Sequence, residues 1–247
     1  MLSVGVLAQC LMGRSSIWNQ GSGRITQAII ALALLSTIIA ILIFNPFTNN
    51  IAKSTVTKSS VLSIWVLITL RTIIAICGIS TLVYIVTKVK RDALLHHTSS
   101  GTFEPIIMKG LWRLSTFTCW SFIGLSITFA VLASCSWMEI FGIQIPYLLL
   151  KFVTLIYPIV YANSLLVTLV VTFILIPANQ KRGHPLESWF KLPEQIMHNV
   201  NIVVLTLELI LGDLPIDIQS ITLIPLFGIS YVIFAASSSI ISTEGNF

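Results

Sequence analysis

Long runs of apolar residues, each followed by a short polar stretch, repeat along the whole chain. Each run has about 20 residues or more, the length that an α-helix needs to cross the hydrocarbon core of a bilayer. The pattern therefore predicts an all-α fold, a polytopic transmembrane helix bundle of about six spans. The expected spans are Ile25–Phe44, Val61–Val86, Leu111–Trp137, Pro146–Ile176, Glu194–Gly212 and Ile221–Ile241.

Composition supports a membrane protein and argues against a separate soluble domain. Of the 247 residues, 55% are hydrophobic and only 9% are charged, too few charges to cover a water-soluble fold. We expect one bundle domain over residues 25–241, between a flexible tail at 1–24 and a short tail at 242–247.

The basic residues predict how the bundle is oriented. Ten of the 14 Lys and Arg residues fall in the N-terminus and in the loops after the second and fourth spans, which six spans place on one side. The positive-inside rule then predicts that both termini are cytoplasmic, in the endoplasmic reticulum or the plasma membrane. Basic residues at helix ends indicate contact with membrane lipids, not with nucleic acid.

The fifth span carries ionisable and amide side chains deep in an apolar run. At about 100° per residue, His198, Asn201 and Glu208 share one helical face. The other faces are apolar, with Ile202, Val203, Leu207 and Ile210. An ionisable residue in a spanning helix normally faces the bundle interior, so this face marks a functional-site hypothesis.

Arg71 lies roughly 15 Å along the second span, where a cation needs a partner. Glu208 is the natural candidate, which makes Arg71 and Glu208 an expected structural polar pair. Two alternatives remain open from the residues alone. The guanidinium is a counter-charge for a substrate carboxylate, or its head group extends along the helix to water.

The start of the third span suggests ester chemistry. If it is helical throughout, Arg113, Thr116 and Trp120 share a face, which stacks a cation, a hydroxyl and an aromatic wall. A neutral imidazole can take the proton of a threonine, whose oxygen then attacks an ester carbonyl. His198 is the one histidine in an expected span. The structural alternative is a Thr116 hydroxyl that bonds a backbone carbonyl one turn back.

Several short stretches resemble one membrane family. The sequence WRLSTF at Trp112–Phe117 resembles the W-[KR]-x-x-T-F stretch of the androgen-induced membrane hydrolase family, which is grouped with the rolling stone membrane proteins. The pair Met197-His198 with Glu208 ten positions after the histidine is similar to a second family pattern. Further similar stretches are Leu155–Pro158 and Ile221–Phe234.

The resemblance implies an activity and assigns its residues. It implies hydrolysis of esters of hydroxylated fatty acids, with Thr116 as nucleophile and His198 as base. Beside this pair, we expect Arg113, Trp120 and Asn201 to bind substrate, Arg113 as a carboxylate clamp and Asn201 as an orienter of the imidazole.

Other functions are weighed against the hydrolase. A non-catalytic scaffold or a cell-fusion-type protein is the alternative, and a small transporter is disfavoured because no internal repeat is visible. HExxH, P-loop, GxSxG and dinucleotide-binding motifs are absent, and we expect no metal and no cofactor. The four cysteines have no CxxC spacing, so we expect them to be unpaired.

Overall fold

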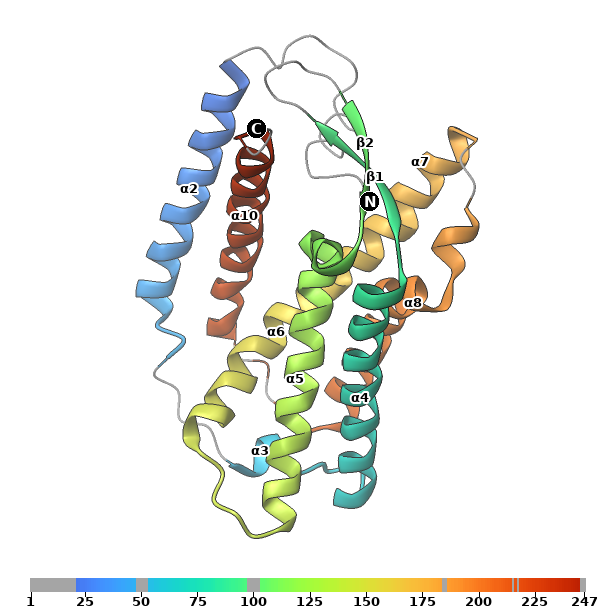
Figure 1. The fold of residues 1–247 in the computed structure, drawn as a ribbon. Coiled ribbons are helices and arrows are strands. Elements are labelled where there is room, and N and C mark those ends of the chain that lie inside the picture. The colour runs from blue at the N-terminus through green and yellow to red at the C-terminus, as the bar shows by residue number, and fades with distance from the viewer. Residues whose placement is uncertain are drawn as a thin grey trace.

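The computed structural model describes residues 21–47, 53–96, 103–183, 186–214, 216 and 218–244. Within these residues the fold is a helical bundle, which confirms the all-α prediction (Figure 1). Four helical segments are long and apolar enough to cross a membrane. They are α4 (Ile64–Lys88), α5 (Phe117–Ile140), α6–η2–α7 (Tyr147–Leu169, Val170–Leu175, Ile176–Lys181) and α8–η4–α9 (Leu192–Gln195, Ile196–Val200, Asn201–Leu211). The protein is therefore an integral membrane helical protein.

The first and last expected spans form a helical pair beside this bundle. Helix α2 (Gly21–Phe44) and helix α10 (Ile224–Glu244) lie side by side in Figure 1 and contact one another. Helix α2 has 24 residues and α10 has 21, lengths similar to those of α4 and α5. Helix α2 begins inside the expected tail at 1–24, while residues 1–20 and 245–247 lie outside the described part of the chain.

Helices α4 and α5 pack at close range along their lengths. A Cβ atom built on Gly78 of α4 would lie 2.6 Å from Ser126 Oγ of α5. Only a residue without a side chain leaves that space, and small residues are how membrane helices bring their backbones together. The buried core continues from this contact into α6 and α9, with Leu125, Phe129, Val153, Tyr157 and Leu205.

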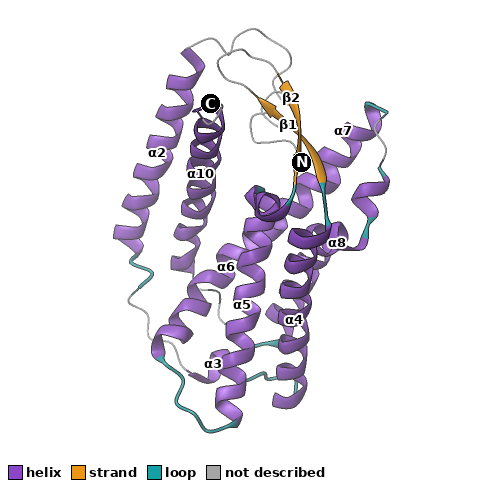
Figure 2. Ribbon diagram, in the orientation of Figure 1, coloured by secondary structure: helices purple, strands orange, loops and turns teal. Residues whose placement is uncertain are grey.

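The loop expected over residues 88–110 is in part a β-hairpin. Strands β1 (Arg91–His96) and β2 (Phe103–Met108) pair antiparallel, with Arg91 opposite Met108 (Figure 2). The hairpin lies within the connection between the second and third expected spans, where pairing the two backbones satisfies their N–H and C=O groups within the segment. His97 lies outside the described residues.

Short elements complete both ends of the bundle. Helix α3 (Lys53–Thr57) lies at the end opposite the hairpin (Figure 1). The hairpin end carries two 3₁₀ turns, η1 (Gly110–Ser115) and η3 (Glu187–Phe190), and a third, η5 (Ile218–Leu223), precedes α10. The expected single long fourth helix is confirmed, with Pro158 inside α6 and a π-helical turn at η2.

Candidate functional site

The fifth span is polar inside and apolar outside, as its sequence predicts. His198 and Glu208 are 1% and 5% exposed, whereas Val203 and Ile210 are 54% and 63% exposed. Asn201 and Leu205 are buried on the same face. Helices of soluble proteins bury apolar residues and expose polar ones, and this helix does the opposite, as expected where the outer surface contacts lipid.

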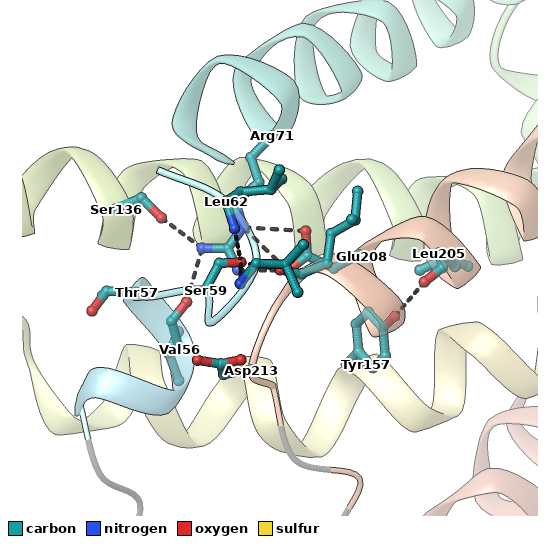
Figure 3. Close-up of polar contacts among 12 residues, drawn as sticks. Val56, Thr57, Ser59, Leu62, Arg71, Ser136, Tyr157, Leu205, Glu208 and Asp213 are labelled. Atoms are coloured by element: carbon teal, nitrogen blue, oxygen red, sulfur yellow. Dashed lines mark hydrogen bonds and ion pairs between the residues drawn. The ribbon is translucent and has the colours of Figure 1, made fainter. Parts of the chain in front are cut away.

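At the C-terminal end of this face, Glu208 forms an ion pair with Arg71. The Arg71 Nε lies 3.2 Å from each Glu208 carboxylate oxygen, and one terminal nitrogen lies 2.5 Å from Oε1 (Figure 3). The other terminal nitrogen donates to Val56 O at 2.8 Å and to Ser136 Oγ at 2.6 Å. The guanidinium is 0% exposed, so its head group does not reach water and the pair expected from the sequence forms.

Hydrogen bonds from Ser59 and Ser60 connect two chain segments beside this ion pair. The Ser60 backbone N–H and hydroxyl both donate to Asp213 Oδ1, at 3.0 and 2.8 Å, and Ser59 Oγ donates to the Leu211 carbonyl. These bonds join the segment after α3 to the end of α9. The Arg71 guanidinium of α4 also bonds α3 through Val56, α5 through Ser136 and α9 through Glu208. Because four elements meet at this one group, we infer a structural role for Arg71 and Glu208.

A second polar cluster lies at the hairpin end and contains His198. Its Nε2 lies 3.0 Å from Glu194 Oε2, and the other oxygen of that carboxylate lies 3.5 Å from a terminal nitrogen of Arg113. Arg113 and His198 are each 1% exposed. Two buried nitrogens of the cluster, Arg113 Nε and His198 Nδ1, have no hydrogen-bond partner among the residues that the structure describes.

A π-helical turn presents the histidine to this cluster. In η4 the Asn201 N–H bonds the carbonyl of Ile196, five residues back. The carbonyl of His198 accepts from Thr168 Oγ1 of α6 at 2.5 Å, and Trp189 of η3 lies with its ring centroid 5.9 Å from the imidazole. Single π turns inside α-helices recur at functional sites, and this one carries a histidine whose carbonyl bonds α6 and whose ring lies beside η3.

Thr116 does not lie on a shared helical face with Arg113 and Trp120, and that expectation was wrong. Arg113 belongs to the 3₁₀ turn η1, and Thr116 has φ −83° and ψ 147°, which ends that turn. Its Oγ1 accepts the Cys119 N–H at 3.3 Å, so Thr116 is the N-cap of α5. A threonine that caps a helix adopts extended backbone angles, and the helix therefore starts one residue later.

No hydrogen bond joins Thr116 to His198 among the described residues. Hydrogen bonds run from His198 to Glu194 and from Glu194 to Arg113, which lies three residues before Thr116. The expected aromatic wall is elsewhere, because Trp120 packs against α10, with ring centroids 4.8 to 6.3 Å from those of Phe227, Tyr231 and Phe234.

The partner of the imidazole is Glu194 and not Asn201. Asn201 instead donates through Nδ2 to the Met197 carbonyl at 2.7 Å, and its Oδ1 lies 3.4 Å from Thr168 Oγ1. The sequence alone could have predicted Glu194 as the partner of His198, since residues four positions apart lie side by side on a helix. That spacing was missed because Glu194 stands at the polar start of the span.

Among the described residues no disulfide joins Cys77, Cys119 or Cys135. Comparison of the chain with protein-family models, with curated proteins and with solved structures gives no match.

Proposed function

We propose that the protein is an intramembrane lipid-ester hydrolase, with Thr116 as nucleophile, His198 as general base and esters of hydroxylated fatty acids as the substrate class. The proposal rests on the cluster at the hairpin end of the bundle and on the resemblance of Trp112–Phe117 and Met197-His198 to the androgen-induced membrane hydrolase family.

The position of the His198 ring against Glu194 is the observation that carries the proposal. With Nε2 on the Glu194 carboxylate, a neutral His198 carries its proton on Nε2 and keeps a lone pair on Nδ1. That Nδ1 is buried and accepts no hydrogen bond from the described part of the chain. An imidazole oriented by a carboxylate with its second nitrogen bare is the arrangement a general base requires.

The position of Thr116 suits a nucleophile. Its oxygen lies at the N-terminus of the 24-residue helix α5 and accepts the Cys119 N–H. The positive end of a helix dipole favours the anionic oxygen that forms when the hydroxyl loses its proton. In the reaction the Thr116 hydroxyl would exchange its bond with the Cys119 N–H for one to the imidazole.

The reaction follows from these roles. His198 Nδ1 takes the Thr116 proton as Thr116 Oγ1 bonds to the ester carbonyl carbon. The bond to the leaving alcohol then breaks, and the imidazolium returns the proton to that alcohol. Water, deprotonated by His198, attacks the acyl-threonine, which releases the fatty acid and restores both side chains.

Turnover of a branched fatty-acid ester by the purified protein in nanodiscs tests the proposal, with fluorophosphonate labelling as a second readout. Thr116→Ala, His198→Ala and the double variant should be equally inactive, because the members of a coupled pair do not contribute additively. Thr116→Ser should keep part of the activity.

Ser115→Ala is the matched control. Ser115 is the adjacent hydroxyl, and it donates to the Trp112 carbonyl outside the cluster. Its loss should leave turnover unchanged. Full hydrolysis or labelling in Thr116→Ala would reject Thr116 as the nucleophile.

A non-catalytic scaffold is the second candidate, and one observation favours it. The bond from the Cys119 N–H gives Thr116 a complete structural role as a helix cap. In that case the wild-type protein turns over no lipid ester, and Thr116→Ala lowers its unfolding free energy by about 1 kcal/mol, the usual contribution of an N-cap.

We further propose that the hairpin end is cytoplasmic. The exposed cations Lys109 and Lys181 lie at that end, and Lys58 follows α3 at the other. In a cysteine-free background, Lys58→Cys should react with an impermeant maleimide in intact cells, and Lys109→Cys and Lys181→Cys only after permeabilisation. The reverse pattern would invert the orientation.

A further inference from the structure

Two turns at the hairpin end of the bundle carry the same combination of exposed side chains. One turn leads into η1, and the other joins η3 to α8. Each presents one exposed cation beside two large apolar side chains, Lys109 with Leu111 and Trp112, and Lys191 with Phe190 and Leu192. The four apolar side chains are 74%, 59%, 62% and 72% exposed, in that order. We call Lys109–Trp112 together with Phe190–Leu192 the paired-turn surface.

An ion pair joins the two turns. A terminal nitrogen of Arg113, in η1, lies 3.5 Å from Glu194 Oε1, in α8. Arg113 is 1% exposed, so the cations that these two turns present to the outside are Lys109 and Lys191. Neither lysine forms an ion pair with another residue that the structure describes. Both are therefore available to an anionic partner.

The two ends of the bundle differ in charge. At the hairpin end, residues 88–113 and 181–194 contain eight Lys and Arg against four Asp and Glu. At the opposite end, residues 53–63, 138–146 and 211–214 contain two of each kind. An excess of basic residues at one membrane boundary attracts anionic lipid headgroups over about one Debye length.

We propose that the paired-turn surface binds the headgroups of anionic phospholipids in the adjoining leaflet. Lys109 and Lys191 contact the anionic oxygens, while Trp112 and Phe190 lie at the boundary between headgroups and acyl chains, where aromatic side chains are enriched. A nucleic acid or a small soluble acid would bind the lysines and leave four large apolar side chains in water. An amphiphile covers both kinds of side chain. This interaction is independent of the proposed hydrolysis.

Quenching of tryptophan fluorescence by brominated lipids tests the proposal with the full chain in phosphatidylcholine vesicles at low salt. The quenching that is lost in Trp112→Phe reports the paired-turn surface. The quenching lost in Trp65→Phe reports the opposite end, where Trp65 is 59% exposed near the start of α4. Brominated phosphatidylserine should associate more strongly than brominated phosphatidylcholine at Trp112, and the two lipids should associate equally at Trp65.

The lysine variants assign this preference to the two turns. Lys109→Gln and Lys191→Gln should each lower the preference at Trp112 about fivefold, the effect of one lysine near an anionic surface. Lys109→Arg and Lys191→Arg keep the charge and should keep the preference. Salt at about 1 M should reduce it, because the Debye length is then only about 3 Å.

Lys58→Gln is the matched control, because Lys58 is an exposed lysine at the opposite end and its loss should leave the preference unchanged. Glycerophosphoserine, which has the headgroup without acyl chains, should not compete. Its competition would indicate a site for soluble phosphate esters and overturn the proposal. Equal association of both lipids at Trp112, full preference after loss of both lysines, or an equal loss in Lys58→Gln would also overturn it.

Discussion

Removing the negative charge of Glu208 should destabilise the bundle more than any change to an exposed ion pair. Arg71 is 0% exposed and places three of its contacts on the Glu208 carboxylate. Arginine cannot lose its proton, so Glu208→Gln leaves a buried cation with only the Val56 carbonyl and the Ser136 hydroxyl as other acceptors. Breaking such a buried pair costs about 3–5 kcal/mol of unfolding free energy.

The reverse substitution should cost less. In Arg71→Gln the Glu208 carboxyl can take up a proton and become neutral, a response that Arg71 lacks. The double variant Arg71→Gln with Glu208→Gln should therefore be more stable than the sum of the single changes predicts, by about 1–3 kcal/mol.

Reversible unfolding in mixed detergent micelles, followed by tryptophan fluorescence, measures these differences. The chain supplies its own control in the ion pair of Lys53 and Glu139, whose side chains are 46% and 23% exposed. Glu139→Gln should cost about 1 kcal/mol, because the Lys53 side chain is solvent-exposed and water screens this partly buried pair. The reasoning fails if Glu208→Gln and Glu139→Gln cost the same, or if the effects at Arg71 and Glu208 are strictly additive.

Two further predictions concern the packing around α9. A Cβ atom at Gly212 would lie 2.7 Å from Glu208 Oε1 and 2.8 Å from the Glu208 carbonyl, so Gly212→Ala should cost about 1–3 kcal/mol. Gly228→Ala, where a Cβ meets nothing within 4 Å, should not destabilise the protein, and equal losses at both sites would contradict this. The Tyr157 hydroxyl donates to a backbone carbonyl of α9 at 2.5 Å, so Tyr157→Phe should cost about 1 kcal/mol by the same unfolding assay. Tyr161→Phe removes a longer contact of 3.4 Å and should lower the unfolding free energy by less. A larger loss in Tyr161→Phe than in Tyr157→Phe would contradict this prediction.

The sequence by itself determined the membrane class, the helical fold and the inward face of the fifth span. These properties are local, because apolar length sets the spans and a period of about 3.6 residues sets the face. The partnership of Arg71 with Glu208 was also predictable, since a buried arginine requires an acceptor and few acidic residues lie within the spans.

Tertiary structure decided how the other polar residues are arranged. Whether Thr116 lies inside a helix or caps one depends on whether its side chain bonds the Cys119 N–H, a competition that hydropathy does not register. The choice of Glu194 over Asn201 as partner of His198 depends on the π turn at Ile196–Val200 and on contacts from α6 and η1. Such contacts join residues far apart in the chain, and only the packed bundle brings them together, because no local pattern encodes the distance between two helices.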